Sequence, residues 1–276
     1  MSEYQIRDFD SLDDYHECVR FQESIWGGGF SERVPVAILK VSQLLGGVAA
    51  GAYDSSGDLA GFVYGMTGLR HGDVAHWSDM LAVRPELQGT GLGWRLKAYQ
   101  REVLVERGVT TMYWTFDPLE SRNAHLNLNK LGAVAGEYVQ DMYGQTDSPL
   151  HRGIGTDRFV PRWDLTSEDV VKRMAGDGRA SAALSEEGAE RALGVVLDGP
   201  HPLPSEPVTG LSASRIVVAV PESIQDIKAD SLESAVLWRR ATRTVFSHYL
   251  DRGFVARALF RREGWSDYLL NAEHHT

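Results

Sequence analysis

Apolar and polar residues follow two different periods along the first 165 residues. Runs with a two-residue period predict strands, whereas apolar residues at four-three-four spacing, as in Leu92, Leu96, Tyr99 and Val103, predict helices. The order is a strand (4–9), two helices (11–26, 35–45), three strands (48–53, 59–66, 75–83), a helix ending near 107, a strand (111–117), a helix (121–131) and two strands (137–143, 158–165). This order predicts an α/β fold with a mixed, twisted sheet flanked by helices.

The pattern changes after residue 165. Residues 166–214 are rich in Ser, Gly, Ala and Glu, and four of the ten prolines lie between Pro200 and Pro207, which predicts a linker. A strand (215–220), a helix (232–251) and a strand (254–260) follow. We therefore expect a domain over 1–165, a linker-like segment over 166–214 and an extension over 215–276, whose order makes it a candidate partial pseudo-repeat of the domain.

The turn between the strand 75–83 and the next helix carries glycine at every second position. Gly89, Gly91 and Gly93 permit positive φ and close approach of a ligand, and the helix start offers unpaired N–H groups with a partial positive charge. Such a turn suits a pyrophosphate. The turn lacks the third glycine of the dinucleotide fingerprint and the Gly-Lys-Ser/Thr of nucleoside-triphosphate loops. An ordinary strand-to-helix turn is the alternative.

The segment Leu81-Ala82-Val83-Arg84-Pro85, followed by Gln88-x-x-Gly91-x-Gly93, resembles the pyrophosphate motif of the GNAT superfamily of acyl-CoA N-acyltransferases. The resemblance implies an α+β core over residues 4–165 with a mostly antiparallel sheet, and acyl-CoA as the co-substrate. It also implies that the strand backbone at Leu81 and Val83 binds pantetheine. The candidate residues for coenzyme A are Leu81, Val83, Gln88, Gly89, Thr90, Gly91, Leu92, Gly93 and Asn123.

The helix at 121–131 departs from this family. Counted back from Gly132, Ser121 occupies the usual Asn position and Leu128 the usual Tyr position, so the usual acid is missing. The segment from Phe116 to Ala133 looks like a subgroup of longer bacterial GNAT proteins associated with N-acylamino acid racemases and o-succinylbenzoate synthases. That resemblance implies an amino acid acceptor, of D or L configuration, and acetyl-CoA or succinyl-CoA as the donor.

Alternation along the strand 75–83 predicts two faces. One carries Trp77, Asp79, Leu81 and Val83, and the other carries His76, Ser78, Met80 and Ala82. Asp79 is the only carboxylate in this strand and is the first candidate for the base that takes a proton from the acceptor amine. An exposed residue or a salt bridge is the alternative. His76 is a candidate substrate contact or a hydrogen-bonded structural histidine.

Other candidate side chains come from several segments. Tyr138 and Tyr143, on the strand 137–143, are candidates for the acid that protonates the leaving thiolate. Their different parity places them on opposite faces unless a bulge intervenes. A substrate carboxylate calls for an arginine, and Arg70, Arg152 and Arg158 are candidates, or surface residues.

Two further sets of side chains are candidates for the pocket wall. The family resemblance places Trp26, at the end of the first helix, beside the acceptor pocket. Asn123 and Asn127 lie four apart on one helical face and are candidates for hydrogen bonds to pantetheine or substrate.

Composition narrows the classes of partner. The formal net charge of −10 disfavours nucleic acid and anionic membranes, and no apolar run approaches the roughly 20 residues that span a bilayer. Cys18 is the only cysteine, which excludes an internal disulfide and fits a reducing cytoplasm. The nine histidines show no helical metal-binding pair. We expect a soluble, cytoplasmic protein without a metal, and a homodimer is compatible with the extension.

The sequence therefore predicts an acyl-CoA-dependent N-acyltransferase acting on a small amine. The enzymatic alternative is a protein-lysine or peptide N-terminal acetyltransferase, which needs an open groove, whereas Trp26, Trp77 and Trp114 favour a closed pocket. The other alternative is a non-catalytic sensor that binds acyl-CoA with the same turn.

Overall fold

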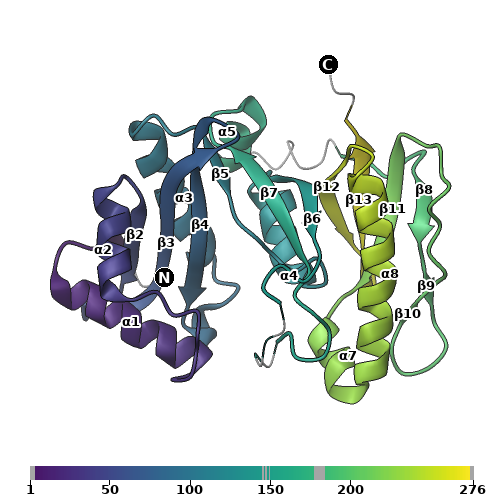
Figure 1. The fold of residues 1–276 in the computed structure, drawn as a ribbon, viewed down its shortest axis with the longest axis horizontal. Coiled ribbons are helices and arrows are strands. Elements are labelled where there is room, and N and C mark those ends of the chain that lie inside the picture. The colour runs from purple at the N-terminus through teal and green to yellow at the C-terminus, as the bar shows by residue number, and fades with distance from the viewer. Residues whose placement is uncertain (1–3, 145, 147, 149, 177–183, 274–276) are drawn as a thin grey trace. The chain divides into compact units, whose positions relative to one another are not determined.

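The computed structural model describes residues 4–144, 146, 148, 150–176 and 184–273. The chain divides into two units, one formed by residues 1–114 and 164–166 and the other by residues 115–163 and 167–276 (Figure 1). The boundary after Trp114 differs from the expected domain boundary at 165, because residues 115–163 share a core with the C-terminal part of the chain.

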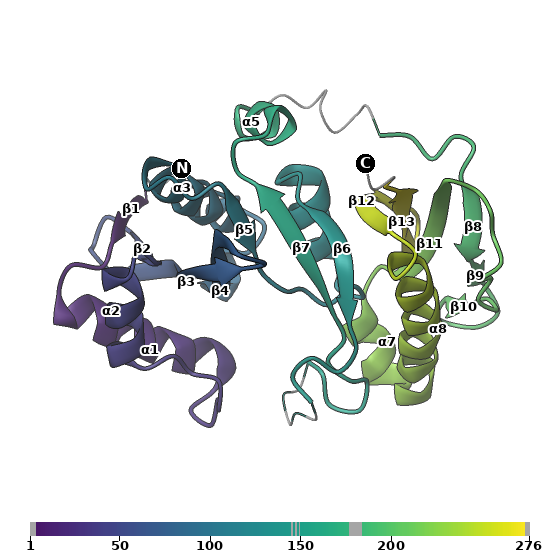
Figure 2. The same cartoon turned by 45° about the horizontal axis from the view of Figure 1, so that its top comes forward.

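The first unit is a sheet with helices on both faces. Strands β1 to β5 follow one another across the sheet in sequence order, and neighbours are antiparallel except for the parallel pair β4 and β5. Helices α1 and α2 cover one face and α3 covers the other (Figure 2). The bounds are β1 (Gln5–Asp8), α1 (Leu12–Trp26), α2 (Val36–Leu44), β2 (Val48–Tyr53), β3 (Leu59–Arg70), β4 (Asp73–Val83), α3 (Leu92–Glu106) and β5 (Thr111–Tyr113).

A capping box fixes the start of α1. The Ser11 side chain accepts from the Asp14 N–H and the Asp14 carboxylate accepts from the Ser11 N–H. Arg7 donates to both carboxylate oxygens of Asp14, at 3.0 and 2.8 Å, which holds the pKa of Asp14 well below its usual value. The helix then buries Cys18 and Phe21 against Phe62 of β3.

The second unit contains a sheet in the order β7-β6-β12-β13-β11-β8, and α8 packs against it. Trp238, Thr242, Val245 and Tyr249 form the predicted stripe of α8, and all four are completely buried. The bounds are α4 (Ser121–Ala124), η2 (His125–Lys130), β6 (Val134–Val139), β7 (Arg158–Asp164), α5 (Glu168–Met174), β8 (Glu190–Leu193), β9 (Val195–Val196), β10 (Leu203–Pro204), β11 (Arg215–Pro221), α7 (Ile224–Asp230), α8 (Leu232–Leu250), β12 (Phe254–Arg261) and β13 (Trp265–Ala272).

The predicted fold class is confirmed, because both units carry a mixed, mostly antiparallel sheet flanked by helices. The strand expected at 137–143 is wrong in its bounds, since β6 ends at Val139 and Asp141 turns the chain with φ of 44°. The linker expected over 166–214 contains α5, and β8 pairs in parallel with β11. The sequence analysis also missed β13, whose apolar residues complete the core of the second unit.

Candidate active site

The glycine-rich turn joins β4 to α3 through a short 3-10 helix, η1 (Pro85–Leu87). Gly89 and Gly91 have φ of 80° and 93°, a region that residues with a Cβ seldom enter. A Cβ at Gly91 would meet no atom within 4 Å, so the space in front of the helix is open. Gly93 does not have positive φ. An added Cβ there would lie 3.5 Å from the Leu81 side chain, an ordinary van der Waals contact, so Gly93 faces Leu81 of β4 without a close approach that requires glycine.

The first turn of α3 presents backbone donors to that space. The Arg95 N–H bonds to the Gly91 carbonyl at 3.0 Å, so the N–H groups of Leu92, Gly93 and Trp94 precede the first helical bond. Gly91 is the N-cap, without a side-chain cap, and the first turn carries no acidic residue. These donors and the partial positive charge of the helix start fit the pyrophosphate of coenzyme A.

One edge of β4 is open beside this turn. The parallel pairing of β4 with β5 consists of His76 with Met112 and Trp77 with Tyr113. Within the described ranges, no residue pairs with β4 beyond Trp77 on that side. The backbone from Asp79 to Val83 therefore offers N–H and C=O groups to an extended ligand such as pantetheine.

A β-bulge interrupts β4 at Asp79. Tyr64 pairs with Met80 and Gly65 pairs with Ser78, so Asp79 has no partner on β3. The extra residue changes the side-chain alternation: Ser78 faces α3, where it bonds to Gln100, and Leu81 also faces α3 at Gly93. The predicted common face of Trp77, Asp79, Leu81 and Val83 is therefore wrong for Leu81, because alternation assumes an unbroken pairing.

The environment of Asp79 favours its protonated form. The carboxylate is exposed at the strand surface, but the protein atoms around it raise its pKa, and the negative charge of Glu32 adds to this effect. A hydrogen bond from the Trp77 side chain lowers the pKa and opposes both. A carboxylate with a raised pKa is a better proton acceptor, which suits a general base.

No family model and no curated protein matches the chain. Solved structures that resemble it include an acetyltransferase of the GNAT family from Streptococcus pneumoniae, with 20% identity, 58% of this chain and 98% of that chain covered, and a TM-score of 0.47. Another is the ribosomal-protein-S18-alanine N-acetyltransferase from Escherichia coli (17% identity, 60% and 96% covered, TM-score 0.46). A third is Ard1 from Thermoplasma volcanium (17% identity, 59% and 99% covered, TM-score 0.45). These similarities are too low to assign an activity or a substrate to this chain.

His76, a predicted substrate contact, lies inside the first unit. Its side chain is fully buried, with Nδ1 3.0 Å from the Thr67 hydroxyl and Nε2 3.0 Å from the Gln100 amide. Burial, together with the positive charges of Lys97 and Arg107, lowers the pKa of His76 to about 3. His76 is therefore neutral at physiological pH and its ring nitrogens are engaged, as in the structural alternative.

Lys97 was not predicted, and it lies in the same buried network. Its Nζ is 2.7 Å from the Ser78 hydroxyl and 4.2 Å from the centre of the Trp114 ring. Burial lowers the pKa of Lys97 to about 7. The sequence shows only a lysine on an amphipathic helix, so no local signal distinguishes it from a surface residue.

The free energy of unfolding should depend on the protonation of Lys97. Between pH 7 and pH 10.5 the unfolded chain keeps a proton that the folded protein has lost, so stability should rise by about 1.4 kcal/mol per pH unit from this group. Below pH 7 both states are protonated and this contribution stays constant. Lys97→Met should remove the rise. Urea unfolding of both proteins at several pH values between 7 and 10 tests this, and parallel stability curves would contradict it.

Trp26, expected at the pocket wall, is half-buried at the end of α1. Its ring stacks on Phe30 with centroids 5.1 Å apart and meets the edge of Phe62 at 6.3 Å. The indole thus packs partly against the core below β3. Its role as a substrate contact stays a prediction.

The two candidate acids, Tyr138 and Tyr143, both belong to the second unit. Their hydroxyl groups differ in exposure and in hydrogen bonding. The Tyr138 hydroxyl donates to the buried Asp157 carboxylate, and burial together with that negative charge raises the pKa of Tyr138 far above its usual value. Arg243 completes this network with Asp157. Tyr143 lies outside β6, is 43% exposed, and has its hydroxyl 2.9 Å from that of Thr115. Tyr143 is therefore the better candidate for proton transfer.

The helix expected at 121–131 changes its winding. It begins as α4, and η2 then continues as a π-helix in which the Leu131 N–H bonds to the Leu126 carbonyl, five residues back. The predicted α-helix over 121–131 is therefore correct in its extent but not in its winding after Ala124. Leu128 lies in the core, and the buried Asn127 donates to the exposed Asn123 at 3.2 Å.

Arg158, expected to bind a substrate carboxylate, is buried among groups of its own unit. It donates to the Asp157 carbonyl at 3.1 Å and lies 2.9 Å from His151 Nε2. The Arg158 guanidinium lies 3.6 Å from a carboxylate oxygen of Asp117. The same oxygen accepts a hydrogen bond of 2.5 Å from Arg239. In the structure the charge of Arg158 thus faces an internal carboxylate.

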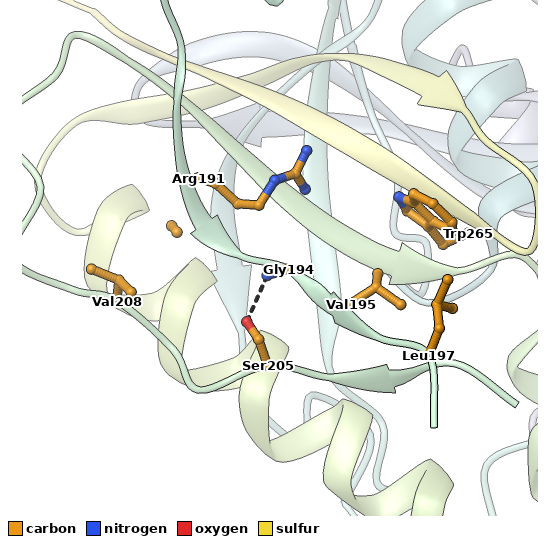
Figure 3. Close-up of a pocket in the computed structure, with 8 residues that line it drawn as sticks. Arg191, Gly194, Val195, Leu197, Ser205, Val208 and Trp265 are labelled. Atoms are coloured by element: carbon orange, nitrogen blue, oxygen red, sulfur yellow. Dashed lines mark hydrogen bonds between the residues drawn. The ribbon is translucent and has the colours of Figure 1, made fainter. Parts of the chain in front are cut away.

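The second unit has a recess of about 490 Å³ at the end of β8 (Figure 3). Val195, Leu197 and Trp265 lie together on one side of it, and the Gly194 N–H donates to the Ser205 hydroxyl at 2.8 Å. Arg191 is already held by both carboxylate oxygens of Asp267. The recess has neither a glycine turn nor a helix start, so it does not fit a pyrophosphate.

The described residues contain neither a membrane-spanning helix nor a metal site. No helix in this part of the chain has the length and apolar character needed to cross a bilayer. Over the same residues, no three His, Cys, Asp or Glu side chains come together in an arrangement that would hold a metal ion.

Proposed function

We propose that the chain is an acyl-CoA-dependent N-acyltransferase that transfers an acetyl or succinyl group to the amine of a small molecule. The observation that carries this proposal is a continuous arrangement in the first unit. An uncapped helix start behind two left-handed glycines adjoins a strand with an open edge, and Asp79 lies at the bulge of that strand. A phosphate site, a site for an extended ligand and a candidate base thus follow one another along β4.

The residues divide the work as follows. The N–H groups of Leu92, Gly93 and Trp94 bind the pyrophosphate, with Gln88, Gly89 and Thr90 in the turn around it. The backbone at Leu81 and Val83 binds the pantetheine amides, and a β4 N–H stabilises the oxyanion. Asp79 takes a proton from the acceptor ammonium, after which the amine attacks the thioester carbon and a C–N bond forms. The C–S bond then breaks, and the nitrogen loses its second proton to solvent.

Tyr143 stays the candidate for the acid that protonates the departing thiolate, because its hydroxyl is exposed whereas that of Tyr138 is held by Asp157. Trp26, Asn123 and Arg158 stay candidates for contacts to the two substrates. The resemblance to the racemase- and synthase-associated subgroup supports an amino acid as the acceptor. A non-catalytic sensor is the second candidate, and the buried Leu128 in the usual Tyr position favours it.

The test is release of free thiol from acetyl-CoA and succinyl-CoA, with D- and L-amino acids as separate acceptor pools. We expect release that requires one donor and one pool. Tight binding of acyl-CoA without release from any pool would favour the sensor, and no binding at all would contradict both.

A further inference from the structure

A hollow lies on one face of the first unit, where β3, β4 and β5 meet. Three successive cross-strand pairs share this face: Met66 with Trp77, Gly68 with Ala75, and Arg70 with Asp73. Gly68 and Ala75 have almost no side chain, so the surface is lower at this pair than at the larger side chains of Met66, Trp77 and Arg70 on either side. This low part of the surface is the floor of the hollow. The resulting cavity of about 260 Å³ is also lined by Tyr113, the partner of Trp77 on β5.

The hollow is open and mostly apolar. A Cβ at Gly68 would meet no atom within 4 Å, and the Met66 side chain is 40% exposed. Its volume lies below the ~300–1,000 Å³ of pockets that enclose drug-sized ligands. A space of this size suits one apolar side chain of a ligand rather than a whole large molecule.

Trp77 connects the hollow to the proposed base. Its ring lines the hollow, and Trp77 lies two residues before Asp79 on β4. The negative charges of Asp79 and Glu32 attract an ammonium group. An amine held at Asp79 therefore has the hollow beside it.

Arg70 contributes a positively charged group to the wall of the hollow, opposite Asp73 in the strand register. Its guanidinium lies over the Tyr113 ring, 4.0 Å from the ring centre. A guanidinium in this position can donate to a ligand carboxylate.

We propose that the hollow formed by Met66, Gly68, Arg70, Ala75, Trp77 and Tyr113 binds the side chain of the acyl acceptor, which is an amino acid with an apolar side chain. The inference rests on the proposed acyltransferase function and specifies its acceptor. The amine faces Asp79, the apolar side chain fills the space above Gly68 and Ala75, and the carboxylate lies on the side of Arg70.

Gly68→Val tests this assignment by filling the hollow from its floor. Gly68 lies within β3 without positive φ, and valine favours strands, so the variant should fold. Gly210→Val is the matched control, since Gly210 also has free space and no positive φ but lies in the second unit. The measured quantity is kcat/KM for phenylalanine, as each enantiomer, and for glycine.

For the wild type we expect kcat/KM for phenylalanine to exceed that for glycine by about tenfold or more, as is usual for an apolar subsite. Gly68→Val should reduce this ratio to about two or less, and Gly210→Val should preserve it. Equal use of both amino acids by the wild type, or an unchanged ratio in Gly68→Val, would overturn the assignment.

Calorimetric binding of phenylalanine in the presence of coenzyme A separates this inference from the proposed function. Phenylalanine that binds the wild type but not Gly68→Val, without thiol release from any acceptor, would support the hollow and overturn acyl transfer. Thiol release with glycine, without binding of phenylalanine, would support acyl transfer and overturn the hollow.

Discussion

Replacing Gly91 by valine abolishes the binding of acyl-CoA and leaves a folded protein. Gly91 has φ of 93°, which a β-branched residue adopts only at a cost of about 1–3 kcal/mol. The valine side chain would also project into the open space before the N–H groups of α3. Loss of two charge-assisted hydrogen bonds corresponds to an affinity lower by on the order of 100-fold or more. Calorimetric titration with acetyl-CoA measures this change.

Gly57→Val is the matched control. Gly57 has φ of 86° in the turn between β2 and β3, and an added Cβ there also meets no atom within 4 Å. The control should lose a similar amount of stability and keep its full affinity for acetyl-CoA. Unchanged affinity in Gly91→Val would remove the basis for placing the pyrophosphate at this turn.

Asp79→Asn lowers turnover most at neutral pH. At pH 7 the acceptor is mainly an ammonium ion, and loss of the base should reduce kcat/KM by about 100-fold. The raised pKa of Asp79 makes the carboxylate a stronger proton acceptor, and it stays ionised above that pKa. As the pH approaches the pKa of the amine itself, a growing fraction of the acceptor is already neutral. The defect should therefore shrink toward alkaline pH in a profile of kcat/KM.

Asp58→Asn supplies the control for charge, because Asp58 is an exposed carboxylate in the turn between β2 and β3 of the same unit. It should leave the pH profile close to that of the wild type. A defect of Asp79→Asn that is equally large at every pH would show that Asp79 does not act as the base.

The features that the sequence predicts well depend on local signals. The glycine turn is one, since glycine spacing and the preceding proline determine its backbone without reference to distant residues. The capping box of α1 and the apolar stripe of α8 are others. Each of these can be read within a window of a few residues, so each agrees with the structure.

The features that the sequence does not predict depend on pairing between distant segments. The bulge at Asp79 exists only in the register of β4 against β3, and no glycine or proline marks it. The Tyr138 hydroxyl reaches Asp157 only after β6 and β7 have paired. The same reason explains why alternation placed Leu81 on the wrong face.

The hollow was missed because the predicted strands stop too early, at residues 66 and 75. In the structure β3 continues to Arg70 and β4 begins at Asp73, and this extension supplies Gly68 and Arg70 of the hollow. His71 and Gly72, both with positive φ, close the hairpin as a two-residue turn. A His-Gly pair between two strands was the available local signal, although it is weaker than Asn-Gly.

The most direct test of acyl transfer follows an isotopically labelled acetyl group from acetyl-CoA to its product. The intact protein is incubated with labelled acetyl-CoA and the preferred amino acid, and mass spectrometry measures the N-acetyl product against the free thiol released. The account predicts labelled amide and thiol in equal amounts, both reduced together in Asp79→Asn. Thiol accompanied by free acetate and no amide would contradict it, because the chain would then hydrolyse the thioester rather than transfer its acyl group to an amine.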